Sequence, residues 1–468
     1  MALDTLLEER NALDLEVRKH EGALSPLRRM PPELLSLIFQ NALFPHYPSA
    51  DTPWIISAVC SRWRNITLSL PSLWSTIVLD FRDDPKPIMG RLRAHLVRAG
   101  DSPLRITFAT CEEDCFADTE RDMLEILAVY SDRWETVTMS GSGEVYSDLA
   151  YFIADGNSAD GFPLLRELEI IIHSDIVDDG FQDLFARCPS LRFAIVKQDP
   201  YPYPPVTLEL PFSQLLRFSG SNTWASHLHS LYSASNLVDC VLYCRELGSI
   251  PSSQSTVTLP SLLRLSVSRT EGLEFLDTPA LQELYGCDKH TPHLYSFLKR
   301  VGKLQKLVAP WSRRGGSRSP TPELARLLYA APTITTLGIY VPVDLVADLF
   351  SILAPTAQNE TTVPEPVPTL SAISLRVLRD VSDDGVPPPE LDQGVLMETL
   401  ESQWQRGSWR SVKLFCPEFE PSARTLDRMA LLRAEGMQVI VFDAGRTLYH
   451  DLVSPDFRLF EDYSLFDY

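Results

Sequence analysis

A short apolar pattern recurs along most of the chain and constrains its fold more than any other feature. It consists of an apolar residue, two variable residues, a second apolar residue, one variable residue and a third apolar residue, as in Leu165-Leu168-Ile170. The last two apolar residues alternate as in a short strand with one buried face. Clear further copies begin at Leu191, Leu262, Ile334 and Leu370, and weaker ones at Trp134, Leu237, Leu281, Leu304 and Trp409. Such triplets, at a period of roughly 20–29 residues, are typical of leucine-rich repeats.

Helix-like runs separate these copies, for example "HLYSFLKRVG", "PELARLLYAA" and "VLMETLESQW". A strand and a helix that alternate in this way predict an α/β solenoid, with a parallel sheet on its inner face and helices outside. Successive copies begin between 19 residues apart (Leu262 to Leu281) and 36 residues apart (Ile334 to Leu370). The asparagine or cysteine expected after each triplet is mostly absent. We therefore predict an irregular leucine-rich-repeat solenoid over residues 81–445.

The segment before the repeats, residues 23–80, has a different pattern that begins with "SPLRRMPPELLSLIFQ". Pro32 suits the first position of a helix, and Glu33 is favourable in the first turn. We expect this helix to end near Leu43. Its apolar residues cover more than the third of the circumference that one core needs. One side of the helix can therefore pack inward, while the other side is free for a partner.

A second helix is expected from "WIISAVCSRWRNITLSL", residues 54–70, with Thr52 as its cap and Pro53 at its start. A turn with Trp74 and a strand-like ending follow. Together with the preceding segment, these residues predict a small helical bundle.

Two stretches of this bundle, "LSPLRRMPPELLSLIF" and "VCSRWRNITLSLPSLWSTI", resemble an F-box in the variant common in large fungal families. The order and spacing of the motif agree, although the proline-rich turn between Leu43 and Trp54 is longer than in the minimal motif. The resemblance implies a module that docks on the Skp-type adaptor of a cullin–RING ubiquitin ligase. It implies an adaptor-binding surface made of Leu27, Pro31, Leu34, Leu35, Ile38, Val59 and Trp63.

In this interpretation the repeats hold a target protein while the F-box holds the ligase, so the chain is a substrate receptor without chemistry of its own. Solenoid geometry predicts target contacts at outward positions between triplet members, for example Glu169, Ser266 and Lys413. A repeat scaffold that binds no adaptor is the alternative, and an enzyme on an unrecognised fold is a third.

The two ends of the chain have their own patterns. In residues 1–22, positions such as Leu6, Leu13 and Val17 form a heptad-like stripe. They predict an amphipathic helix that docks on its own protein or self-associates. Residues 446–468 mix acidic and aromatic side chains. This tail could serve as a docking peptide, pack on the last repeat or fray.

The net charge of −20 and the pI of about 4.9 argue against nucleic acid and an anionic membrane surface as partners. No apolar run approaches the roughly 18–20 residues of a membrane span, and the first residues lack the pattern of a signal peptide. The eight cysteines do not form a disulfide framework in so long a chain. We expect reduced, mostly buried thiols in a cytoplasmic or nuclear protein.

Motifs for catalysis and cofactor binding are missing from the sequence, including a phosphate-binding loop, a dinucleotide fingerprint and a nucleophile elbow. Three groups have spacings that a metal site would allow: Cys111 with Cys115, Cys240 with Cys244, and Cys287 with His290 and His293. None supplies four ligands in one place. We therefore expect no catalytic residues, no metal and no cofactor.

Overall fold

The computed structural model describes residues 26–42, 51–82, 88–110, 117–155, 161–173, 179–198, 206–244, 255–286, 292–310, 321–353, 368–378, 390–416 and 419–443, together with residues 9–10, 12–14 and 16–17. The chain forms two compact units, Met1–Ser140 and Gly141–Tyr468. The domain boundaries expected from the sequence, after residues 22, 80 and 445, remain predictions.

Short helices dominate the start of the first unit, and further helices alternate with strands through the rest of the chain. The α-helices are α2 (Pro26–Arg29), α3 (Pro32–Asn41), α4 (Thr52–Val59), α5 (Ser61–Leu68), α6 (Pro71–Trp74), α7 (Met89–Ala99), α8 (Ala117–Ala128), α9 (Gly143–Asp155), α10 (Asp179–Gln182), α11 (Trp224–Leu231), α12 (Pro292–Arg300), α13 (Thr321–Ala330), α14 (Val346–Leu353), α15 (Gln393–Gln405) and α16 (Ala423–Ala434). The described residues also form the 3-10 helices η1 (Ser131–Arg133), η2 (Phe212–Gln214), η3 (Glu271–Phe275) and η4 (Val343–Leu345).

The strands are β1 (Thr76–Asp80), β2 (Leu104–Ala109), β3 (Trp134–Gly141), β4 (Glu167–Ile172), β5 (Phe193–Gln198), β6 (Arg217–Asn222), β7 (Asp239–Cys244), β8 (Val257–Thr258), β9 (Arg264–Val267), β10 (Leu276–Asp277), β11 (Glu283–Gly286), β12 (Lys306–Pro310), β13 (Thr336–Pro342), β14 (Ala372–Leu378), β15 (Ser411–Cys416) and β16 (Gln438–Asp443). Fourteen of them form one sheet in chain order, and β8 pairs with β10 in a second sheet.

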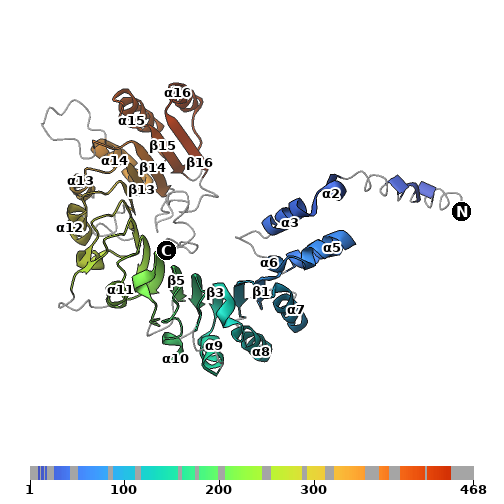
Figure 1. The fold of residues 1–468 in the computed structure, drawn as a ribbon. Coiled ribbons are helices and arrows are strands. Elements are labelled where there is room, and N and C mark those ends of the chain that lie inside the picture. The colour runs from blue at the N-terminus through green and yellow to red at the C-terminus, as the bar shows by residue number, and fades with distance from the viewer. Residues whose placement is uncertain are drawn as a thin grey trace, which may run out of the picture. The chain divides into compact units, whose positions relative to one another are not determined.

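The register of the long sheet is parallel and regular. From β13 to β16, for example, Leu337, Ile373, Val412 and Val439 stand opposite one another in turn. Figure 1 shows helices of the second unit, such as α12 and α13, along one side of its strands. Parallel strands joined by helical crossovers in chain order confirm the predicted α/β solenoid of leucine-rich-repeat type.

The predicted triplets form the core of this solenoid. Leu165, Leu168 and Ile170 are at most 2% exposed, and the copies at Leu191, Leu262, Ile334 and Leu370 are likewise buried. Their side chains point toward the helices, since alternate residues of a strand face opposite sides.

The triplet pattern missed strands that depart from it. In β2, Leu104, Ile106 and Phe108 alternate strictly, and the register shifts between Leu104 and Arg105. In β6, Gly220 occupies the place of the third apolar residue, where a β-carbon would lie 2.4 Å from the Phe218 ring. Both strands therefore keep the fold without keeping the motif.

The single helix expected over residues 54–70 is wrong, because α4 ends at Val59 and α5 begins at Ser61. Cys60 between them is fully extended, with φ −161° and ψ 170°, and its Sγ accepts a hydrogen bond from the Trp63 backbone N–H at 3.5 Å. Asp51, not Thr52, precedes α4, and it makes no side-chain cap. Because of this break, the apolar sides of α4 and α5 do not form the continuous stripe that one helix would have given.

The expected helix at the start of the chain is helical at the described residues, which include Leu13 and Val17. Both side chains are more than half exposed, so the expectation that this stripe docks on its own protein fails at these two positions. Residues 446–468 lie outside the described residues.

Candidate functional site

Helix α3 has two apolar sides with opposite burial. Leu35 and Phe39 are 1% and 2% exposed and face the bundle. Leu34, Leu37 and Ile38 are 49%, 54% and 46% exposed on the other side. The expected two-sided helix is therefore confirmed. The choice of Leu35 as a surface residue is wrong, because this side chain belongs to the core.

Further exposed apolar side chains extend the candidate surface beyond α3. Leu27 of α2 is 44% exposed, and Ile55 and Val59, one turn apart on α4, are 64% and 57% exposed. Pro31, directly before α3, is exposed as well. We call Leu27, Pro31, Leu34, Leu37, Ile38, Ile55 and Val59 the apolar bundle surface. Leu37 and Ile55 were missing from the sequence prediction, although each continues a helical stripe with a predicted neighbour.

Trp63, the remaining predicted contact, is partly buried and holds the bundle together. Its ring lies 4.8 Å from that of Phe39, measured between centroids. The neighbouring Arg62 guanidinium donates to the Met30 carbonyl and so joins α5 to the turn before α3. These contacts fix the direction in which α3 presents its exposed side.

A cluster of aromatic and basic side chains joins this bundle to α7. The indole N–H of Trp54 donates to His95 Nε2 at 2.9 Å, and His95 Nδ1 lies 3.2 Å from the Trp74 carbonyl. A carbonyl oxygen only accepts, so Nδ1 carries the proton and the ring is neutral. The Arg98 guanidinium lies 4.2 Å and 4.5 Å from the Trp74 and Trp54 ring centroids. Burial lowers the pKa of His95, and the charges of Arg98 and Arg91 lower it further.

The three residues predicted to contact a target have different surroundings. Glu169 is half-buried and pairs with Lys197 Nζ at 3.1 Å. Lys413 is half-buried on β15. Ser266 is 0% exposed, so the prediction that it lies on an open surface is wrong.

A buried ion-pair ladder crosses the same face of the sheet. The Asp239 carboxylate on β7 is 1% exposed and accepts from Arg217 on β6 and from Arg264 on β9, each at 2.8 Å. The register aligns these three residues across neighbouring strands. Sequence reasoning missed them, because partners 22 and 25 residues apart form no local motif.

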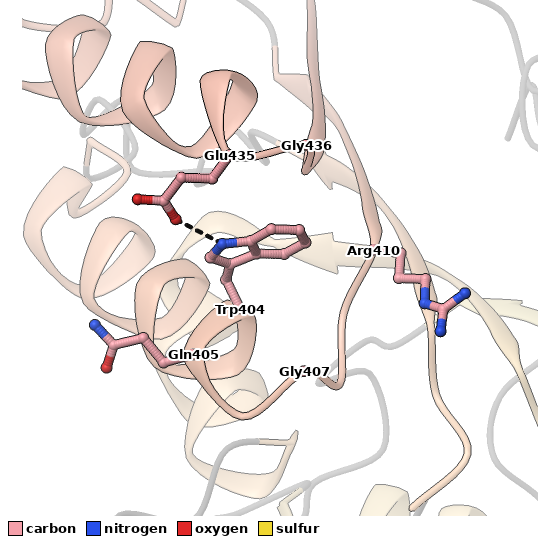
Figure 2. A pocket seen from close by; sticks show the side chains of 6 residues that line it. All are labelled: Trp404, Gln405, Gly407, Arg410, Glu435 and Gly436. Atoms are coloured by element: carbon pink, nitrogen blue, oxygen red, sulfur yellow. Dashed lines mark hydrogen bonds between the residues drawn. The ribbon is translucent and has the colours of Figure 1, made fainter.

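A second candidate site is the shallow pocket between the C-terminal ends of α15 and α16 (Figure 2). Its lining includes Trp404, whose indole N–H donates to the Glu435 carboxylate at 2.7 Å. Gly407 and Gly436 have φ of 72° and 106°, the left-handed backbone with which helices often end. Figure 2 shows the Arg410 guanidinium pointing away from the indole, so the pocket has no convergent set of charged groups.

The described ionisable groups form no catalytic set. Burial raises the pKa of the Cys188 thiol to about 12 and also raises those of Cys240 and Cys244. These thiols are therefore protonated and unreactive at neutral pH. Among the residues that the structure describes, no three metal-ligating side chains come together, and no helix is long and apolar enough to cross a membrane. Cys111, Cys115, Cys287 and His290 lie outside that part of the chain.

Comparison with known proteins adds only a distant similarity. No protein-family model and no curated protein sequence matches the chain. Among solved structures, one chain of the "Crystal structure of TLR13-ssRNA13 complex" is 14% identical with a TM-score of 0.26, and the match covers 80% of this chain and 40% of that one. This similarity carries no functional argument. The strand order and register define the class: a leucine-rich-repeat-like parallel solenoid that follows a small helical bundle.

Proposed function

We propose that this chain is the substrate-recognition subunit of a Skp–cullin–F-box type ubiquitin ligase, active in the cytosol or nucleus. The observation that carries the proposal is the exposed apolar side of α3, with Leu34, Leu37 and Ile38 about half-exposed. It lies within the segment that resembles an F-box. A helix that shows its apolar side to solvent gains stability when a partner helix or groove buries that side.

The proposed adaptor contacts are those of the apolar bundle surface. Leu35 and Trp63 have supporting roles instead, since Leu35 is buried and Trp63 packs on Phe39. Buried anchors near the centre of an interface carry most of its binding energy. We expect Leu34 and Ile38, which lie one turn apart, to be such anchors.

The proposed mechanism is proximity. A receptor that holds a target near a charged ubiquitin-conjugating enzyme raises the effective concentration of the target's lysines and performs no bond chemistry itself.

Co-expression with a Skp-type adaptor followed by affinity capture tests the proposal. The wild-type chain should capture the adaptor in equal amounts, and Leu34→Asp/Ile38→Asp should reduce capture at least about tenfold. A matched control is Val97→Asp/Val129→Asp, which changes two side chains that are 79% and 75% exposed elsewhere in the first unit. The control should capture the adaptor like the wild type.

Failure of the folded wild-type chain to capture any Skp-type adaptor would overturn the receptor role. The alternative is a repeat scaffold without a ligase role, for which the long parallel sheet with its ordered rows of side chains is the supporting observation. In that case the bundle substitutions should leave the binding of every partner of the repeats unchanged.

A further inference from the structure

The face of the sheet that points away from the helices is more basic than the chain as a whole. We call it the helix-free face; it consists of the residues that alternate with the buried triplet positions in β4 to β16. From β9 to β15 its charged side chains are one carboxylate, Glu283, and four cations. Of these cations, Arg264 pairs with Asp239 of the neighbouring β7, and the other three are Lys306, Arg376 and Lys413. The whole chain carries a net charge of −20. A local excess of cations on so acidic a protein favours an acidic ligand.

Aromatic side chains are interleaved with these cations. Lys306 Nζ lies 5.1 Å from the Tyr285 ring centroid, and the Arg376 guanidinium carbon lies 5.7 Å from that of Tyr340. The Tyr285 hydroxyl donates to the Glu283 carboxylate, which holds the ring down on the sheet. In such pairs the cation can attract an acidic group of a ligand, and the ring beside it can pack against an aromatic group of the same ligand.

The middle of the helix-free face is withdrawn from solvent. Ser266 and Tyr285 are 0% exposed and Val308 is 1% exposed, although all three point away from the helices. On the last strand, Ile440 stands in register with Lys413 on the same face and is 39% exposed.

Residues 444–468, which follow β16 directly, have the matching composition. They contain five acidic residues and only two arginines, with six aromatic residues between them, in "AGRTLYHDLVSPDFRLFEDYSLFDY". An extended segment spans about 3.3 Å per residue, whereas neighbouring strands lie only about 4.8 Å apart. A segment of this length can therefore reach across β15 to β11 from the end of β16.

We propose that the helix-free face of β9 to β15 binds an acidic, aromatic peptide, and that residues 444–468 of the same chain are that peptide. The segment is an internal ligand, so a target that uses this face must displace it. The proposal concerns the repeats and does not depend on adaptor docking.

The test uses a fluorescent peptide of residues 446–468 and a full-length chain with a neutralised tail, Asp456→Asn/Glu461→Gln/Asp462→Asn/Asp467→Asn. The peptide should bind the neutralised chain, with anisotropy as the measurement. It should bind the wild-type chain at least about tenfold more weakly, because there the face is occupied. Salt should weaken the binding, as expected for charged partners.

Charge reversal on the face checks the site. In the neutralised chain, Arg376→Glu/Lys413→Glu should weaken peptide binding at least about tenfold. The control Lys303→Glu/Arg326→Glu makes the same charge change at two exposed positions outside the strands and should have less than about a twofold effect. If the reversed pair fails to fold, Arg376→Gln/Lys413→Gln gives the same comparison with a milder change.

Three results would overturn the proposal: no peptide binding to the neutralised chain, equal binding to the wild-type chain, or an equal loss of binding in the Lys303→Glu/Arg326→Glu control. Adaptor capture is measured separately on the same proteins and should not change. A chain that binds the peptide and fails to capture an adaptor would overturn the proposed ligase role alone.

Discussion

The helical bundle and the repeats use the same apolar residue types in opposite ways. In the bundle, Leu34 and Leu37 of α3 are about half-exposed. In the repeats, Leu265, Leu284 and Leu337 are at most 1% exposed, and each stands in register with its neighbours across the sheet. A leucine at the period of the repeat therefore stabilises the fold, whereas a leucine outside any buried stripe is available to a partner.

Ion pairs provide the sharpest test of this comparison. Asp239 in the repeats is 1% exposed between Arg217 and Arg264, whereas Asp51 before α4 pairs with Arg91 at the surface. Asp239→Ala should lower the free energy of unfolding by about 4 kcal/mol, because it leaves two partly buried guanidinium groups without their carboxylate. Asp51→Ala should cost less than about 1 kcal/mol. Urea unfolding followed by circular dichroism measures both.

Equal costs for the two aspartate variants would contradict the view that the repeats bury their ion pairs and the bundle does not. Asp239→Asn is a useful control, because it keeps the shape of the side chain and some of its hydrogen bonds. Its cost should lie between those of the two alanine variants.

The next largest effect is expected in the apolar core of the repeats. Leu284 is 0% exposed at the middle position of its triplet. Leu284→Ala should lower the free energy of unfolding by about 3 kcal/mol, through lost burial and the cavity that remains. Chemical denaturation measures it, and a loss below about 1 kcal/mol would show that the strand repacks around the smaller side chain.

Two buried histidines, one near the bundle and one in the repeats, predict how stability depends on pH. Burial lowers the pKa of His95 below the ordinary 6.5 and that of His227 to about 4. The unfolded chain therefore takes up protons first as the pH falls. Stability should be complete above pH 6.5 and decline below it, by at most about 1.4 kcal/mol per pH unit for each histidine.

Unfolding free energies at pH 7.5 and pH 5.5 should therefore differ less in His95→Gln and in His227→Gln than in the wild-type chain. For His95 the cause is local, since a proton on Nε2 would face the Trp54 N–H beside Arg98. An unchanged pH dependence in His95→Gln would show that this ring is protonated or exposed in the folded state.

The repeats could be predicted from the sequence because their pattern is both local and periodic. Where the period fails, at Leu104-Ile106-Phe108 and at Gly220, the strand persists because its neighbours pair with it on both sides. Such pairing connects residues far apart in the chain, so no local motif reports it.

The bundle was harder to predict in detail. Helix α3 has two apolar stripes, and the sequence alone does not say whether Leu35 or Leu34 faces the core. Contacts with α5, such as the Phe39–Trp63 pair, decide it. The break at Cys60 was missed because neither glycine nor proline marks it; a thiol cap on the Trp63 N–H stabilises the new helix start instead.

The smallest expected change in stability comes from an exposed residue of the bundle. Leu37 is 54% exposed on α3, so Leu37→Ala removes little buried surface and keeps a good helix former. The free energy of unfolding should change by less than about 0.5 kcal/mol, while capture of a Skp-type adaptor should weaken. Set beside Leu284→Ala, the same chemical change then affects stability in one region and binding in the other. A large loss of stability in Leu37→Ala would mean that this side of α3 packs within the protein, and the apolar bundle surface would lose its role as a docking site.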